Sequence, residues 1–511
     1  MTFKFHFHCQ EDWPGQSWLA RLPPGAHAID VWCGPAVECA DSWFCEAIWD
    51  GAFGDGAFDE TDIVAGTGAR IRNDRVVFVS SGSTVDRLQW ATQGGVTLVS
   101  NSLACLGSHL ASAALPAYPH YLRDFYSVVR GIRRYRPQLP LVGATVELVY
   151  FDNLEWAGGQ LVRMPKPHAE RRFEAFDDYH DFLKRSLQGV VDNMSDGRRA
   201  RSYSLLGTLS TGYDSTTVTA LAQPLGLDEV ICFERQSGRD RGSEIAHYFG
   251  VTPISVSIGA WRKGSLVEVP FIAGDAFGEE VHYAGAADKL SHRVLLTGYH
   301  GDKVWDQDTP YLSPDLVRGD LSGLALTEYR LGAGFMNCPI PFWGARSIRD
   351  ISRISRSEAM KPWRRSGDYS RPICRRIVES SGVPGDAFGR VKSYASQWFA
   401  LGRLGLSETS LIDYLDYLHS HRSEFIRRGR IPPTMAARWS KLITTGSHAL
   451  AGGLMRTPAF FRAGLQHLPV LSGLIGLRTP NPPHPPMVLG FPRYLFPWAL
   501  EHAMRRYQRV F

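Results

Sequence analysis

The fold is decided by the stretch Tyr203-Ser-Leu-Leu-Gly-Thr-Leu-Ser-Thr-Gly-Tyr-Asp-Ser215. An apolar run over residues 203–209 ends abruptly in small and hydroxyl residues, and residues 217–222 continue as a short helix that stops before Pro224. This order is typical of a strand, a tight loop and a helix N-terminus. We therefore predict a β-strand that delivers the loop 210–215 to the edge of a sheet.

The loop carries groups that suit a phosphate ligand. Ser210, Thr211, Gly212 and Ser215 offer hydroxyl and amide donors, and the helix start adds the positive end of a dipole. Asp214 fits such an anion cradle only if it holds a cation that accompanies the phosphates, and Mg²⁺ is suited to one or two carboxylates plus phosphate oxygens. The simpler alternative is an ordinary turn in which Asp214 or Ser215 caps the helix.

The composition is that of a globular protein with two or three domains. The 511 residues are 44% hydrophobic and 21% charged, and the net charge of +5 does not require nucleic acid or acidic lipid as a partner. The eight cysteines include no C-x-x-C pair, and no secretory signal precedes them, so we predict reduced thiols in a cytoplasmic protein. The most apolar window, residues 465–477, is too short to span a membrane and contains Pro469.

Residues 1–170 are predicted to be rich in β-strands. Residues 76–79, 96–99 and 145–151 are strand-like runs separated by polar turns. His6, His8 and Cys9 could suggest a metal site. Phenylalanine alternates with polar residues over positions 3–8, however, and this pattern favours a half-buried first strand.

A second pattern begins after a boundary near residues 165–170. Apolar residues recur at helical spacing from Phe173 to Met194, and strands and helices then alternate. The predicted strands are 203–209, 230–233, 253–257 and 293–297, and the predicted helix between the middle two is 243–249. Such alternation predicts an α/β fold with a doubly wound parallel sheet, in which the loops after residues 209 and 297 would meet at a ligand-binding edge. Residues from about 400 onward read as helical.

The loop Ser210-Thr-Gly-Tyr-Asp-Ser215 resembles the pyrophosphate loop S-G-G-x-D-S of the PP-loop ATP pyrophosphatases, with Thr in place of the first Gly. An ordered series of further segments resembles motifs of the asparagine-synthetase-like family, over residues 173 to about 400. These segments are Asp240-Arg-Gly-Ser-Glu-Ile-Ala246, Leu295-Leu-Thr-Gly-Tyr-His-Gly-Asp302, Cys338-Pro-Ile-Pro-Phe-Trp343, Arg371-Pro-Ile-Cys-Arg375, Pro384 and Val391-Lys392.

The resemblance implies three parts and a nucleotide chemistry. Residues 1–170 would be a degenerate glutaminase-like domain of the Ntn type, 171–400 the ATP-binding synthetase domain, and 401–511 a C-terminal helical extension. ATP and Mg²⁺ would be the cofactors. The implied nucleotide-binding residues are Leu209, Ser210, Thr211, Gly212, Asp214, Ser215, Gly298 and Arg371; the metal ligands are Asp214 and Asp302; and the catalytic residues are Tyr299, Glu328 and Lys392. Surface charge is the simpler interpretation of Arg371 and Lys392.

Two departures from the family pattern shape the expected reaction. Thr2 stands where the glutaminase needs its N-terminal cysteine, although residues 96–106 resemble an element of that domain, so we expect a relict that makes no ammonia. Tyr299 replaces a Glu of the asparagine synthetases and is similar to the T-G-Y of β-lactam synthetases, which pair this Tyr with a Glu about thirty residues later. Glu328 is placed to be that partner, or is simply a solvated helix carboxylate. Lys303 replaces an acidic residue and leaves only Asp302 as a metal ligand in its loop.

The resemblance implies an AMP-forming synthetase that adenylates a carboxylate and couples it to an amine. The substrate would be a small molecule or peptide that carries these groups. A cyclase of the lasso-peptide or β-lactam type, an intermolecular amide ligase, and an ammonia- or glutamine-dependent asparagine synthetase all remain open. A PP-loop tRNA-modifying enzyme and an inactive scaffold are the alternatives from other classes.

Overall fold

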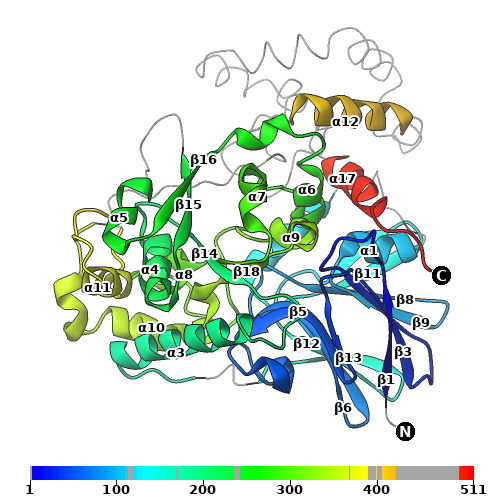
Figure 1. Cartoon of the computed structure of the whole chain (residues 1–511), viewed down its shortest axis with the longest axis horizontal. Coiled ribbons are helices and arrows are strands. Elements are labelled where there is room, and N and C mark those ends of the chain that lie inside the picture. Colours follow the sequence, from blue (N-terminus) through cyan, green and yellow to red (C-terminus); the bar gives the residue numbers. More distant parts are fainter. Residues whose placement is uncertain are drawn as a thin grey trace.

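The computed structural model is a mixed α/β protein, and it describes residues 3–110, 112, 118, 120–167, 171–234, 242–367, 369–389, 399, 406–421 and 494–511. Figure 1 shows the N-terminal strands, in blue and cyan, beside a separate parallel sheet, in green. The β-rich N-terminal part and the parallel sheet predicted from the sequence are therefore both confirmed. None of the described helices is long and apolar enough to cross a membrane.

The N-terminal part contains two sheets. The first has the order β1-β3-β2-β9-β8-β11-β10 and the second the order β13-β12-β7-β6-β5-β4. Within them only β1 and β3 pair in parallel. The strands are β1 (Lys4–Cys9), β2 (Trp18–Leu22), β3 (Ala28–Cys33), β4 (Glu38–Ala40), β5 (Trp43–Trp49), β6 (Val64–Arg72), β7 (Arg75–Val79), β8 (Leu88–Gln93), β9 (Val96–Ser100), β10 (Gln138–Leu141), β11 (Ala144–Val149), β12 (Asn153–Ala157) and β13 (Gln160–Met164).

Apolar side chains fill the space between these two sheets. Trp18 and Val31 of the first sheet and Phe44 and Phe78 of the second belong to one core and are fully buried. The ring of Trp18 packs edge-on against that of Phe44, with 5.1 Å between the ring centroids. The N-terminal part is thus a sandwich that buries one face of each sheet.

Strand β1 has the half-buried pattern that the sequence predicts. Phe5 is buried, whereas His6, His8 and Cys9 are exposed. His8 lies 3.1 Å from Asp30 on β3, and the described residues hold no cluster of three or more His, Cys, Asp or Glu side chains suited to a metal ion. All eight cysteines lie in the described part of the chain, and none of them forms a disulfide.

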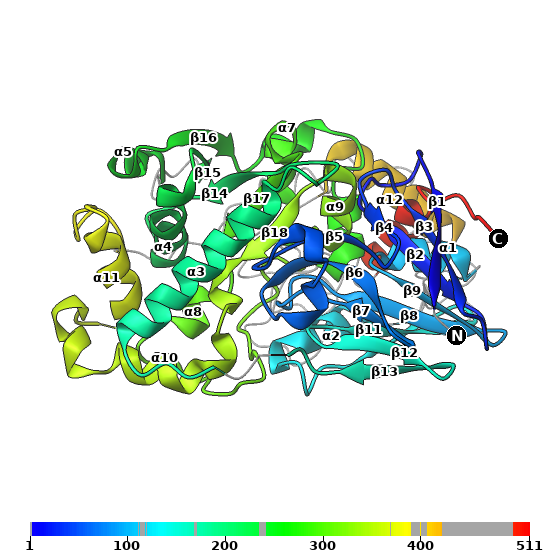
Figure 2. The same ribbon diagram turned by 60° about the horizontal axis from the view of Figure 1, so that its bottom comes forward.

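Helix α3 (Phe176–Met194) follows β13 and joins the two parts of the molecule. The predicted helix starts at Phe173, but the real one starts three residues later, because the Asp178 carboxylate accepts the N–H groups of Glu174 and Ala175 and caps the N-terminus. Its apolar face packs in a core shared with the parallel sheet, and the helix also contacts β5 (Figure 2). The domain boundary near residues 165–170 stays a prediction.

The five-stranded parallel sheet has the order β16-β15-β14-β17-β18. Its strands are β14 (Ser204–Thr208), β15 (Glu229–Glu234), β16 (Thr252–Ser257), β17 (Arg293–Thr297) and β18 (Met336–Pro339). Leu205 and Leu206 alternate between two different cores, so both faces of the sheet are covered. The sequence predicts the first four strands, and β18 was not foreseen.

Helices cover both faces of this sheet. They are α4 (Tyr213–Ala222), α5 (Ala246–Phe249), α6 (Val269–Asp275), α7 (Ala287–Leu290), α8 (Gly301–Val304), α9 (Leu326–Ala333), α10 (Ile348–Ser355) and α11 (Pro372–Ser380). Helix α4 begins four residues before the predicted start at Thr217, so Asp214 and Ser215 lie in its first turn. The predicted helix over 243–249 is split into a 3-10 turn, η5 (Gly242–Glu244), and the short helix α5.

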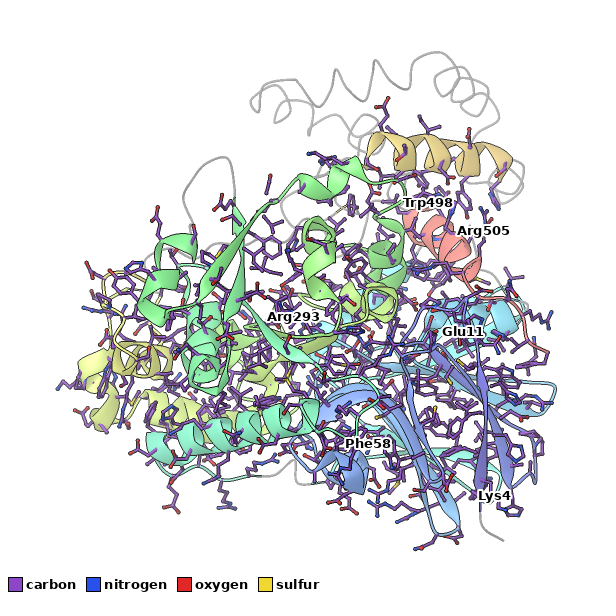
Figure 3. All side chains as sticks on the ribbon, in the orientation of Figure 1. Lys4, Glu11, Phe58, Arg293, Trp498 and Arg505 are labelled. Atoms are coloured by element: carbon purple, nitrogen blue, oxygen red, sulfur yellow. The ribbon has the colours of Figure 1, made fainter. Side chains whose placement is uncertain are left out.

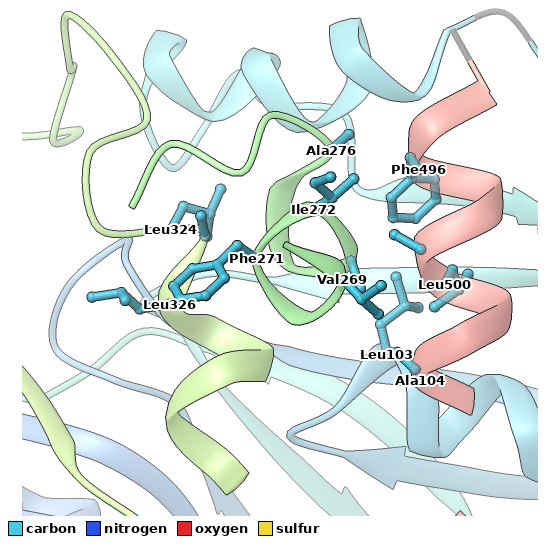
Figure 4. Close-up of a cluster of buried hydrophobic side chains, with 14 of the residues drawn as sticks. Leu103, Ala104, Val269, Phe271, Ile272, Ala276, Leu324, Leu326, Phe496 and Leu500 are labelled. Atoms are coloured by element: carbon cyan, nitrogen blue, oxygen red, sulfur yellow. The ribbon is translucent and has the colours of Figure 1, made fainter. Parts of the chain in front are cut away.

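Residues 494–511 pack against elements from much earlier in the chain. Helix α17 (Leu495–Met504) packs against α6 and against α1 (Leu103–His109), as Figure 4 shows for Phe496 and Leu500. Helix α12 (Glu408–Ser420) lies beside α17, and the Trp498 indole, labelled in Figure 3, donates to the Asp413 carboxylate at 2.7 Å. The described portions of 401–511 contain the helices α12 and α17, and buried residues of α17 belong to the core.

Candidate active site

A cavity of about 210 Å³ lies beyond the C-terminal ends of β14, β15 and β17. Its walls include residues from the segments 208–215 and 297–302, together with Phe233, Tyr283 and Arg371. This edge of a parallel sheet is the usual place for a ligand. The prediction that the loops after residues 209 and 297 come together in space is confirmed.

Hydroxyl and amide groups organise the first loop at the start of α4. The Ser215 hydroxyl accepts the N–H of Ser210 at 3.0 Å, and the hydroxyls of these two serines lie 2.8 Å apart. The N–H of Gly212, the N-cap of α4, donates to the Ser210 hydroxyl at 3.1 Å. Thr211 is in the same loop, and its carbonyl accepts the N–H of Gly389 at 2.7 Å. The helix N-terminus and the two serine hydroxyls border the cavity with donors that suit an anion.

The second loop packs closely on Asp214, and little room is left there for a side chain at two glycines. A Cβ atom on Gly298 would lie 2.6 Å from the Asp214 Cβ, and one on Gly301 would lie 2.5 Å from the Asp214 Oδ1. Both distances are far below a van der Waals contact, and neither glycine has a positive φ. The glycines of the Thr-Gly-Tyr-His-Gly segment therefore serve the close approach of the two loops.

Each carboxylate predicted to bind a metal has a cation beside it. The buried Arg371 forms an ion pair with Asp214, and the Lys303 ammonium lies 2.7 Å from the Asp302 carboxylate. Both carboxylates line the same cavity. The donor set fits Mg²⁺ if phosphate oxygens complete the coordination, because Mg²⁺ is usually held by one or two protein carboxylates.

Tyr299 also lines the cavity, next to Gly298. Its hydroxyl donates to the hydroxyl of Tyr283 at 3.2 Å. Burial raises the pKa of Tyr299 well above its usual range, and the nearby Tyr283 and Glu280 raise it further. The phenol is therefore protonated at neutral pH. It can accept a proton from a substrate only if it gives its own proton to another group.

The expected pair of Tyr299 and Glu328 is not formed. Glu328 lies on α9, outside the walls of this cavity, and its buried carboxylate accepts the Ser102 hydroxyl at 2.7 Å and the N–H groups of Leu103 and Ala104 at 2.6 and 3.3 Å. These N–H groups form the first turn of α1, so the carboxylate binds the positive end of that helix. Glu328 is neither the partner of Tyr299 nor a solvated surface group. It connects the parallel-sheet part to the N-terminal sandwich.

A different glutamate stands beside the tyrosines. Glu280 lines the cavity and is buried, and its carboxylate accepts the N–H groups of Gly323 at 2.6 Å and Ala325 at 3.2 Å. Glu280 and Tyr283 could not be predicted as site residues, because neither lies in a motif of the sequence. The adjacent acidic pair Glu279-Glu280, in a stretch rich in apolar residues, was the signal in the sequence.

His300 adds a neutral imidazole to the cavity wall. It has a φ of 75°, and its ring stacks on that of Phe342 with 4.6 Å between the centroids. Burial lowers the pKa of His300 to about 3, with the Arg318 cation contributing, so the ring is uncharged at neutral pH. His300 was also not foreseen from the sequence.

Two residues of the sequence interpretation lie outside the described residues, namely Lys392 and Thr2. The structure therefore places Ser210, Thr211, Asp214, Gly298, Tyr299, Asp302 and Arg371 in or beside one region, together with Leu209, Gly212 and Ser215, and it removes Glu328 from that region. No protein-family model and no curated protein matches this chain.

Proposed function

We propose that the protein is an ATP-dependent, AMP- and pyrophosphate-forming synthetase that activates a substrate carboxylate as an acyl-adenylate and couples it to an amine. In this proposal the parallel sheet is of the PP-loop ATP pyrophosphatase type and the chain is related to the asparagine-synthetase-like enzymes. The observation that carries the proposal is the packing of Gly298 and Gly301 on Asp214, which brings a hydroxyl-rich loop and an acidic loop into one cavity.

The first loop would bind the triphosphate. The Ser210 and Ser215 hydroxyls now satisfy each other and the loop N–H groups, and a phosphate would replace these contacts with stronger charge-assisted ones. The N-terminus of α4 favours the same negative charge, and Gly212 lets the backbone come close. Leu209, Thr211 and Gly298 are assigned to the nucleotide site on their position in the two loops.

Asp214 and Asp302 would hold Mg²⁺ against the triphosphate. Bound there, Mg²⁺ would neutralise phosphate charge and so favour attack on the α-phosphorus. The cations that now face these carboxylates, Arg371 and Lys303, would then be free to contact phosphate oxygens. A phosphate role for Arg371 therefore needs only a local change of partner.

The reaction would run in two steps. A carboxylate oxygen of the substrate attacks the α-phosphorus, and pyrophosphate leaves. An amine nitrogen then attacks the acyl carbon, and AMP leaves. Tyr299 is the cavity residue assigned to the amine in this second step, and Lys392 is assigned to the negative charge that grows on the tetrahedral intermediate.

The amine would come from a substrate, because the N-terminal sandwich is proposed to be a relict glutaminase domain without its cysteine nucleophile. Thr2 stands at the position of that nucleophile. We expect no glutamate release from glutamine above background, and no covalent adduct with a glutamine-like electrophile at residue 2. Glutamine hydrolysis would favour the alternative of a glutamine-dependent asparagine synthetase.

Carboxylate-dependent exchange between ATP and radiolabelled pyrophosphate tests the proposal. A panel that includes L-aspartate, other amino acids and peptides should contain a carboxylate that supports exchange. Asp214→Asn and Asp302→Asn should each abolish that exchange and leave the fold intact, because each removes one charge from a two-carboxylate site. Asp308→Asn is the matched control, since this carboxylate is exposed and does not line the cavity.

Three outcomes would count against the proposal. Exchange at the wild-type rate in either cavity variant would remove the Mg²⁺ assignment. The absence of exchange with every carboxylate, together with modification of tRNA, would favour a PP-loop tRNA-modifying enzyme. The absence of any nucleotide binding would favour an inactive scaffold.

A further inference from the structure

Glu280 occupies a special place in the cavity, because the backbone holds its carboxylate beside the two tyrosines. It precedes the 3-10 helix η7 (Val281–Ala286), which carries Tyr283, and the N–H of Tyr283 donates to the Glu280 carbonyl at 3.0 Å. The Glu280 carboxylate accepts the N–H groups of Gly323 and Ala325 at 2.6 and 3.2 Å. The carboxylate is thereby fixed at the cavity wall, with lone pairs still available for a ligand.

Gly323 links this carboxylate to Tyr299. A Cβ atom on Gly323 would lie 2.8 Å from the Tyr299 Cδ2, so the backbone that binds Glu280 also touches the Tyr299 ring. The Tyr299 hydroxyl in turn donates to Tyr283 at 3.2 Å. Glu280, Tyr283 and Tyr299 therefore form one compact polar cluster, and all three residues line the cavity.

The surroundings of Glu280 make it a good proton acceptor. Burial raises the pKa of Glu280 well above its usual range, and the charges of Glu279 and Asp275 raise it further, against smaller opposing effects of the Gly323 N–H and of Arg318. The Arg318 guanidinium donates instead to carbonyl oxygens of Thr84 and Ser322. An acid of raised pKa is the stronger base once ionised, and a positive ligand beside it favours the ionised form.

We propose that Glu280 is the amine site of the enzyme: its carboxylate binds a primary amine as the ammonium ion, with Tyr299 and Tyr283 as hydrogen-bond partners, and takes the proton that frees the nitrogen for attack. The proposal rests on the proposed synthetase function and names the substrate class of its second step. It assigns to Glu280 the carboxylate role expected of Glu328.

Protons and electrons balance in this step. The ammonium nitrogen gives one proton to Glu280, and its freed electron pair forms the bond to the acyl carbon of the adenylate. The acyl C–O bond breaks, and its electron pair leaves with the AMP phosphate oxygen. That oxygen takes the second nitrogen proton, so one amide, AMP as its monoanion and protonated Glu280 are formed, and Glu280 returns its proton to solvent before the next turnover.

Glu280→Gln tests the assignment, because glutamine keeps the shape of the side chain and loses the charge and basicity. The assays use the full chain, the carboxylate that supports pyrophosphate exchange, and methylamine as the amine probe. Exchange reports adenylation alone, and methylamide formation reports the second step. We expect Glu280→Gln to keep exchange and to lose about 10²- to 10⁴-fold in amide formation, which is the usual cost of removing a general base.

Glu328→Gln is the matched control, since it also removes a buried carboxylate, but one that binds α1. It should form amide at the wild-type rate. Glu280→Asp keeps a carboxylate and should retain the rise of amide formation with pH that Glu280→Gln loses. The groups that face Glu280 and contribute to that profile are Glu279, Asp275, Arg318, Tyr283 and Tyr299.

The results separate this inference from the proposed function. A Glu280→Gln variant that forms amide at the wild-type rate overturns the inference and leaves adenylation standing. A folded Glu280→Gln variant without exchange also overturns it, because Glu280 would then act in nucleotide or carboxylate binding. Loss of amide formation in a folded Glu328→Gln variant would overturn the assignment of this carboxylate role to Glu280 alone. If Glu280→Gln does not fold, a Glu280→Asp variant without the pH-dependent rise refutes the proton transfer.

Discussion

Replacing Gly298 by alanine tests how closely the two loops of the cavity must approach. The new Cβ would lie 2.6 Å from the Asp214 Cβ and 2.8 and 2.9 Å from backbone atoms of Asp214 and Ser215. Carbon atoms in favourable contact are about 3.5–4.0 Å apart, so the loops must separate by roughly 1 Å. The backbone cannot rotate away as a long side chain would, and Gly298 needs no unusual φ, so the effect is purely steric.

A displacement of this size is large for a reacting site. A misplacement of about 1 Å commonly costs 10²-fold in rate, and we expect Gly298→Ala to lose about 10²-fold in carboxylate-dependent ATP–pyrophosphate exchange. Overpacking of a filled space costs about 1–3 kcal/mol of stability, which a thermal melt would reveal as a modest fall in Tm. The variant is expected to remain folded.

Gly259→Ala is the control, because a Cβ at Gly259 meets no atom within 4 Å. It should exchange pyrophosphate at the wild-type rate and melt at the wild-type temperature. The reasoning is refuted if folded Gly298→Ala exchanges as fast as the wild type. The spacing between Asp214 and the second loop would then be irrelevant to adenylation.

Three further predictions address the second step, the core and a buried charge. Tyr299→Phe should keep pyrophosphate exchange and lose about 10²- to 10⁴-fold in amide formation, and equal rates of amide formation in the variant and wild type would make Tyr299 a packing residue. Trp498→Ala on α17 should lower the free energy of unfolding by about 3–5 kcal/mol in urea titrations, because the side chain is fully buried, whereas the exposed Arg505→Ala should change it little. Burial lowers the pKa of Lys166 to about 7, although its ammonium donates to Ser80 and Asn153. The unfolded state then binds more protons above that pH, so wild-type stability relative to Lys166→Met should rise between pH 7 and 10, and a flat difference would contradict the shift.

The strands of the parallel sheet could be predicted because their sequences are short apolar runs between turn signals. Residues 293–297 form the predicted strand to the residue, and 203–209 differs from β14 by one residue at each end. Strand β18 was missed because Pro339 ends it and Pro341 follows closely, and prolines normally count against a strand. The structure tolerates Pro339 at the last position, where the ladder ends.

The extent and the packing partners of helix α17 also could not be predicted from the sequence pattern. Pro497 suggests a break, but it is the third residue of the helix, and N–H groups in the first turn have no intrahelical partner to lose. The apolar face of α17 could not be assigned a partner from the sequence, because α1 and α6 lie far away along the chain.

Within the candidate site, the polar and acidic residues of the two loops could be predicted from the sequence. Which side chains pair with one another could not. Ser210, Asp214 and Asp302 follow strand ends, and topology alone brings those ends together. The partner of Tyr299 depends on which way α9 faces, and α9 turns Glu328 to the N-terminus of α1. Glu280 could be recognised as a candidate site residue only from the fold, which places it at the cavity wall.

The position of α17 has a consequence for how the molecule is made. Residues 495–504 are synthesised long after α1 and α6, yet they cover apolar side chains of these two helices such as Leu103, Val269 and Ile272. At a synthesis rate of about 5–20 residues per second, these apolar side chains stay exposed for many seconds before α17 is made. A nascent or prematurely ended chain therefore exposes apolar side chains that are buried in the folded protein. Exposed hydrophobic surface of this kind makes a chain prone to aggregation and a target for chaperones. A chain that stops before residue 495 therefore leaves this part of its core uncovered.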